Sequence, residues 1–206
     1  MSLIEAGAPR GRARLAGLLV HGRGGTPEDM IALAGRLGVD DIRWVAPRAP
    51  GGHWYPHRFT VAIEANEPYL SRAVAACDAA LDDATEGGRI PPERTVVLGF
   101  SQGACLVSEH ALRHPGRCAV LVLLTGGLIG SHAREWRPAN GATFETLRAL
   151  VTGSDVDPWV PETRVRETAA LFSRFGAAVE LQIYRGRDHV VSNDEITKAR
   201  ALICAL

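Results

Sequence analysis

The chain has no excess of charge of either sign, and this excludes one broad class of function. Its 206 residues include 23 lysines and arginines and 23 aspartates and glutamates, so the formal net charge is zero. Proteins that bind nucleic acids or anionic membranes usually carry a surplus of basic residues to neutralise phosphates. We therefore expect neither a nucleic acid nor an anionic lipid surface as a partner.

Long hydrophobic runs and a leader are also lacking. The uncharged stretch 118–131 is shorter than the ~20 residues that cross a bilayer, so we expect no membrane span. The N-terminus has an early Glu5 and no apolar core of a signal peptide. The chain has four cysteines, namely Cys77, Cys105, Cys118 and Cys204, and they form neither a CxxC pair nor the spacing of zinc ligands. We therefore expect reduced thiols, a cytoplasmic location and no metal or other cofactor.

Short apolar runs alternate along the chain with glycine-rich turns and amphipathic stretches. The runs predict strands and the amphipathic stretches predict helices. This alternation predicts one α/β domain over 1–206, with its core from about residue 15, and a mostly parallel, doubly wound sheet covered by helices on both faces. The expected strands are 15–20, 42–46, 95–98, 119–124, 149–151 and 179–184, and the expected helices 27–37, 61–84, 102–114, 163–175 and 194–206.

In such a sheet, ligands bind beyond the carboxyl ends of the strands. The third expected strand is followed there by Gly99-Phe100-Ser101-Gln102-Gly103. This is the G-x-S-x-G pattern that holds a nucleophilic serine on a tight strand-to-helix turn. The glycines leave space for the neighbouring strand and helix. The alternative is a tight turn with an incidental serine.

A serine nucleophile needs a base, and the base needs an acid that orients it. Asp157 follows the fifth expected strand and His189 follows the sixth, in the order that this architecture requires. Asp155 lies two residues before Asp157, and we expect it to cap the turn by accepting a backbone N–H two residues on. Pro158 restricts the backbone of Asp157, which makes Asp157 the favoured triad acid.

The glycine-rich loop 21–25 follows the first expected strand. One of its backbone N–H groups, together with that of the residue after the nucleophile, would stabilise the negative charge of a tetrahedral intermediate. Glycine-rich loops also bind phosphates, but neither the P-loop pattern nor the dinucleotide pattern is complete here.

Several motifs together resemble the phospholipase/carboxylesterase branch of the α/β-hydrolases, which includes the acyl-protein thioesterases. The resemblance runs from about residue 15 to the C-terminus and rests on LLVHGRGG, APRAP, GFSQGA, GSDVDPWVP and GRDH. It implies an α/β-hydrolase fold without a large lid domain. It also implies Ser101 as nucleophile, His189 as base and Asp157 as the orienting acid, with the backbone amides of Arg23 and Gln102 as the oxyanion hole. The segment 51–59 departs from the family pattern, so the substrate does not carry over.

Other candidate sites have simpler explanations. The pairs His53/His57 and His110/His114 have the four-residue spacing of metal ligands on a helix. The first pair flanks Pro56 in a loop and the second lies on an expected surface helix without an acidic neighbour, so we expect solvated histidines and no metal. We expect Cys105 to be a buried apolar residue. Trp54, Phe59 and Trp159 could line a substrate pocket or simply pack in the core.

The sequence thus predicts a serine hydrolase that cleaves carboxylic esters of small or medium acyl groups through an acyl-enzyme, with thioesters left open. The expected partner is a small-molecule ester, and a homodimer stays open. One alternative is a non-catalytic small-molecule receptor on the same fold. Another is a lactone or dienelactone-type hydrolase, although dienelactone hydrolases resemble this pattern with cysteine where Ser101 stands.

Overall fold

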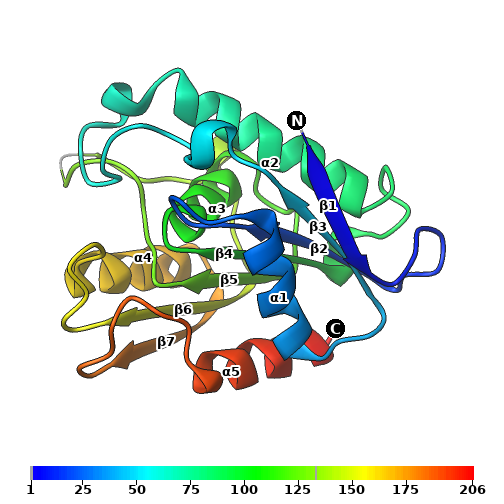
Figure 1. Ribbon diagram of the computed structural model, residues 1–206. Coiled ribbons are helices and arrows are strands. Elements are labelled where there is room, and N and C mark those ends of the chain that lie inside the picture. The colour runs from blue at the N-terminus through cyan, green and yellow to red at the C-terminus, as the bar shows by residue number, and fades with distance from the viewer. Residues whose placement is uncertain (1, 133) are drawn as a thin grey trace.

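The computed structural model describes residues 2–132 and 134–206 and has a central seven-stranded sheet with helices on both faces (Figure 1). The strands lie in the order β1-β3-β2-β4-β5-β6-β7. Only the pair β1–β3 is antiparallel, so the predicted mostly parallel sheet is confirmed. The strands are β1 (Leu3–Gly7), β2 (Leu15–Val20), β3 (Ile42–Pro47), β4 (Thr95–Phe100), β5 (Val120–Leu124), β6 (Arg148–Ser154) and β7 (Ala178–Tyr184).

Two helix layers cover the sheet. Helices α1 (Pro27–Leu37) and α5 (Asn193–Cys204) lie on one face, whereas α2 (Tyr69–Ala84), α3 (Gln102–Arg113) and α4 (Glu162–Arg174) lie on the other (Figure 1). Each layer packs on its own cluster of buried apolar side chains, which explains why the central strands are apolar without alternation. Short 3₁₀ turns occur at Pro50–Gly52, Ile63–Asn66, Pro92–Arg94 and Ala139–Gly141.

The start of α1 shows how local sequence sets a boundary. Thr26 accepts a hydrogen bond from the backbone N–H of Asp29, and the Asp29 carboxylate accepts one from the backbone N–H of Thr26. This capping box, with Pro27 in the first turn, fixes the helix start at the predicted residue. The helix ends at Gly38, whose φ of 59° is the left-handed conformation that glycine adopts without strain.

The structure differs from the expected elements in two places. The strand β1 is additional, because its residues are alternately exposed and half-buried at a sheet edge and form no apolar run that would mark a strand in the sequence. The helix expected over 61–84 begins only at Tyr69. Pro68 has no backbone N–H for a helical hydrogen bond, so a helix cannot continue through it from the 3₁₀ turn at Ile63–Asn66. Across the described residues no separate lid domain is inserted, and none of their helices has both the length and the apolar character to cross a bilayer.

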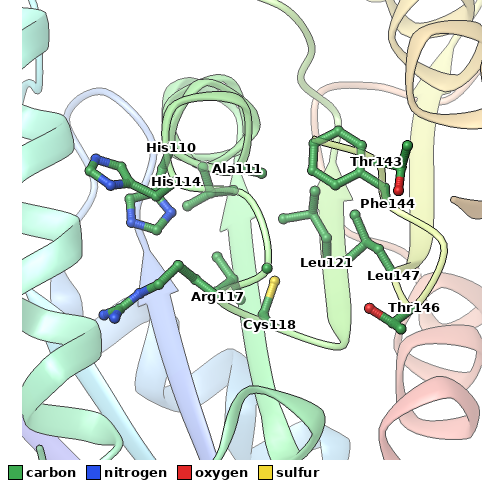
Figure 2. Close-up of a pocket in the computed structure, with 13 residues that line it drawn as sticks. His110, Ala111, His114, Arg117, Cys118, Leu121, Thr143, Phe144, Thr146 and Leu147 are labelled. Carbon is green, nitrogen blue, oxygen red and sulfur yellow. The ribbon is translucent and has the colours of Figure 1, made fainter. Parts of the chain in front are cut away.

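Helix α3 is buried and not a surface helix, which corrects the expectation for His110; His114 caps the C-terminus of α3 and is half-buried. His110 is 1% exposed, and its Nε2 lies 3.1 Å from Oδ1 of Asp78 on α2. Its ring stacks on that of His114 at 5.0 Å between centroids. Figure 2 shows the two rings side by side, with Arg117 below them beside a small cavity. The acidic neighbour comes from a helix 32 residues earlier, so its position follows from helix packing and not from local spacing.

This buried histidine should make the protein less stable in mild acid. Burial lowers the pKa of His110, although the hydrogen bond with Asp78 acts in the opposite direction. The unfolded chain binds this proton near the ordinary histidine value of ~6.5, and the folded protein binds it only at lower pH. Between those values the unfolded state binds more protons, so the free energy of unfolding falls as the pH is lowered.

The variant His110→Gln should flatten this dependence, because its amide can still donate to Asp78 but does not titrate. Denaturant unfolding at about pH 7 and about pH 5 should show a smaller loss of stability than in the wild type. His57→Gln, at an exposed position that forms no ion pair in the described part of the chain, serves as the control and should keep the wild-type slope. An unchanged slope in His110→Gln would contradict the assignment.

Candidate active site

The candidate site lies where β2, β4, β6 and β7 end. Because these strands are parallel, their carboxyl ends meet at one edge of the sheet. The loop 21–25 follows β2, Ser101 follows β4, the loop 155–161 follows β6 and the loop 185–192 follows β7. Segments far apart in the sequence are thus brought to one place.

Ser101 lies in a strained turn between β4 and α3. Its φ of 54° and ψ of −121° are rare for a residue with a side chain. A Cβ on Gly103 would lie 2.0 Å from the carbonyl oxygen of Val20, and a Cβ on Gly99 would lie 2.5 Å from the backbone of Gly103. Glycine is therefore required at both positions for β2, β4 and α3 to approach this closely.

A continuous line of hydrogen bonds connects Ser101, His189 and Asp157. The Oγ of Ser101 lies 2.8 Å from Nε2 of His189, and Nδ1 of the same ring lies 2.6 Å from Oδ2 of Asp157. With Nδ1 donating to the carboxylate, Nε2 is free to accept the serine proton. This is the arrangement in which histidine can act as a general base.

Asp157 is held as a carboxylate. Its Oδ1 accepts hydrogen bonds from the backbone N–H groups of Trp159 at 2.8 Å and Val160 at 2.9 Å. Burial by itself raises the pKa of Asp157, but the hydrogen bonds from His189 and from these two backbone groups outweigh it and hold the pKa below its ordinary value. Asp157 can therefore stabilise a positive charge on His189.

Asp155 does not cap its own turn, contrary to the expectation. Its Oδ1 accepts the backbone N–H of Gly186 at 2.8 Å, which connects the loop after β6 to the loop after β7. The bond to a backbone N–H two residues on is made by Asp157 instead. Asp155 has no hydrogen bond to His189 among the described contacts.

The backbone N–H groups of Arg23 and Gln102 are free to act as donors. Neither donates to an acceptor within the described ranges. Gln102 is the first residue of α3, where the helix leaves its N–H groups unpaired and provides a partial positive charge. Its side chain holds the segment 54–55, because Oε1 accepts the N–H of Trp54 and Nε2 donates to the carbonyl of Tyr55.

His21 is a positioning residue that the sequence did not reveal. Its Nδ1 lies 2.8 Å from the carbonyl oxygen of Gly22, and its Nε2 accepts the N–H of Ala49 at 3.1 Å. Since Nε2 accepts, the proton must be on Nδ1, and the ring is neutral. Burial lowers the pKa of His21, in agreement with this state. The ring thus fixes the start of the glycine-rich loop, and its place as the first residue of that loop was the only sequence signal of such a role.

The loop that carries His189 is anchored by a second unpredicted group. Arg187 forms an ion pair with the buried Glu195 of α5, and its Nη2 donates to Oγ1 of Thr125 at 2.7 Å. Glu195 also accepts the N–H of Ser192 as part of the capping box of α5. Because these contacts lie on both sides of His189, they determine where its ring lies.

A cleft of about 340 Å³ opens on Ser101 and His189. Phe59 and Trp159 line it, as does Tyr55. Trp54, the third aromatic candidate, does not: it is buried, its Nε1 donates to the carbonyl of His21, and it lines a neighbouring cavity.

Among the described residues, only Asp78, His110 and His114 form a group that could hold a metal ion. Arg117 already lies beside Asp78, with its Nε 3.5 Å from Oδ1, and a second cation there would be repelled. This group lies between α2 and α3 and is not part of the Ser101 cleft.

Comparisons with known proteins identify the family and the fold. A profile described as Phospholipase/Carboxylesterase matches residues 4–205. A phospholipase/carboxylesterase from Dyadobacter fermentans superposes with a TM-score of 0.90 and 34% identity over 98% of this chain and 95% of that one. The esterase PE8 gives a TM-score of 0.79 and 24% identity over 99% and 98% of the two chains.

A curated relative, NocK of Nocardia uniformis subsp. tsuyamanensis, is 26% identical over 191 residues. The alignment covers 84% of this chain but only 54% of NocK, so the chain spans about half the length of that relative. The profile match over nearly the whole chain and the shared fold are sufficient for one conclusion. The chain belongs to the phospholipase/carboxylesterase family of α/β-hydrolases.

Proposed function

We propose that the protein is a serine hydrolase that cleaves carboxylic esters, with Ser101 as nucleophile, His189 as base and Asp157 as the orienting acid. The observation that carries the proposal is the hydrogen-bonded line from Ser101 through His189 to Asp157 at the end of a strained turn. The family match and the free N–H groups of Arg23 and Gln102 support it.

The reaction follows from these positions. Oγ of Ser101 attacks the ester carbonyl carbon while Nε2 of His189 takes its proton, and the carbonyl oxygen becomes an oxyanion that the two backbone N–H groups stabilise. His189 then gives the proton to the departing alcohol, which leaves an acyl group on Ser101. Water attacks the acyl carbon with His189 again as base, and the acid and the free serine are released.

Two other functions fit the same fold. A small-molecule receptor would not need the alignment of all three side chains, so the geometry favours the enzyme. Lactones and thioesters react by the same steps. Cys105, one turn after Ser101, is a poor alternative nucleophile, because burial raises the pKa of its thiol to about 12.

A fluorophosphonate probe should label the folded protein at Ser101, and Ser101→Ala should abolish labelling. The probe reacts with a serine whose proton is removed by a nearby base. After a quench with a slowly deacylating ester, fragment-ion mass spectrometry of the peptide 95–113, which contains both Ser101 and Cys105, should place the acyl adduct on Ser101. An adduct on Cys105, or no labelling of folded protein, would overturn the proposal.

Asp157→Asn should lower kcat by about 10³–10⁴ without unfolding the protein, because an amide no longer fixes the tautomer of His189. Asp155→Asn is the matched control two residues away. It weakens the contact with Gly186 and should cost far less turnover. Circular dichroism should show both variants folded. If Asp155→Asn were the more damaging of the two, the acid would have to be reassigned.

Acyl chain length should matter only up to the size of the cleft. Each CH₂ that the protein covers contributes about 0.8 kcal/mol, or roughly fourfold in kcat/KM. A cleft of about 340 Å³ without a separate lid in the described residues can cover a short or medium chain. In a series of p-nitrophenyl esters, kcat/KM should rise and then level off. A steady rise to long chains would show an apolar wall that the cleft does not have.

A further inference from the structure

The cleft beside Ser101 contains cationic side chains and no acidic ones. Arg23 and Arg58 are among the residues that line it, and no aspartate or glutamate is. Asp157 is buried behind His189 and committed to hydrogen bonds with the ring and two backbone groups. The cleft therefore carries a positive charge that its own lining does not balance.

Arg23 is held in place without being neutralised. Its Nη2 donates to the carbonyl oxygens of Tyr55, Pro56 and His57 at 2.6, 3.0 and 3.3 Å. Within the described residues its Nε and Nη1 have no hydrogen-bond acceptor, and it forms no ion pair. Carbonyl dipoles fix the position of a guanidinium, but they do not cancel its charge. Arg23 can thus offer further donors to a bound molecule.

Arg58 has a guanidinium that is free except for an aromatic contact. It lies 5.9 Å from the ring centroid of Trp159, whose side chain is 61% exposed. Its side chain makes no hydrogen bond or ion pair with another residue in the described part of the chain. By contrast, the buried Arg164 and the half-buried Arg187 each pair with a glutamate.

We infer that the cleft takes esters that carry a second, free carboxylate group, which Arg23 and Arg58 bind. The inference rests on the proposed hydrolase function and specifies its substrate class. A guanidinium group matches the two oxygens of a carboxylate with paired hydrogen bonds, and the interaction is stronger in a cleft than in open water. Phe59 and Trp159 provide apolar surface for the rest of the substrate. The anion can lie on the acid part or on the alcohol part of the ester.

Two matched pairs of substrates test separately whether the anion is recognised on the acid part or on the alcohol part of the ester. For the acid part, mono-p-nitrophenyl glutarate is compared with p-nitrophenyl pentanoate, and the spontaneous rate is subtracted. For the alcohol part, p-acetoxybenzoate is compared with its neutral methyl ester. In one pair, kcat/KM for the anionic ester should exceed that for the neutral one by about tenfold or more. Raising NaCl from about 0.05 M to about 0.5 M should reduce that ratio through screening.

Arginine variants identify the groups responsible. Arg58→Gln and Arg23→Gln should each lower the ratio of anionic to neutral kcat/KM, and Arg58→Lys should retain more of it than Arg58→Gln. Arg94→Gln is the matched control, since Arg94 is exposed and precedes the opposite end of β4. It should leave the ratio unchanged.

Failure of this inference can be told apart from failure of the proposed function. The inference alone fails if neutral esters are hydrolysed and Ser101 is labelled, but the neutral ester is preferred in both pairs. It also fails if neither Arg58→Gln nor Arg23→Gln changes the ratio of anionic to neutral kcat/KM. Absence of both hydrolysis and labelling would overturn the hydrolase proposal itself, and the inference with it.

Discussion

The close approach of β2, β4 and the start of α3 is the constraint on which the site depends. At Gly103 a side-chain carbon would lie 2.0 Å from the carbonyl oxygen of Val20, so no other residue fits without moving a strand. This contact brings the loop after β2 close to Ser101, since a Cβ on Gly22 would lie 3.1 Å from the Cβ of Ser101. The strain at Ser101 is the cost of this arrangement, and the sheet hydrogen bonds on both sides of β4 maintain it.

Much of this could be predicted because the responsible residues are local. Apolar runs mark the central strands, Thr26 with Pro27 marks the start of α1, and the glycines around Ser101 mark the turn. The three hydrogen-bonded side chains follow from the strand ends and from their order along the chain. Local sequence patterns do not show which helices pack against each other. The burial of His110 depends on α2 lying against α3, and the edge strand β1 becomes recognisable only when paired with β3.

The residues that position the loops around Ser101 and His189 could not be identified from the sequence for the same reason. His21, Arg187 and Glu195 position the loops that carry Arg23 and His189, but each acts through a partner that is distant in sequence, as with the contact of Arg187 and Thr125 across 62 residues. Their residue types are also common on protein surfaces. A charged or polar residue next to a motif becomes informative only when its burial and partner are known.

The segment 53–59 couples substrate recognition to the oxyanion hole. Gln102 binds its backbone at Trp54 and Tyr55, and the side chain of Arg23 binds the carbonyls of Tyr55, Pro56 and His57. In the proposed mechanism the same two residues provide the backbone N–H groups that stabilise the oxyanion. A change in this segment that alters the cleft would therefore also act on the loop and the helix end that carry these groups. Because the anchors of the segment belong to the glycine-rich loop and to the first turn of α3, the proposed catalysis limits how far specificity can change here.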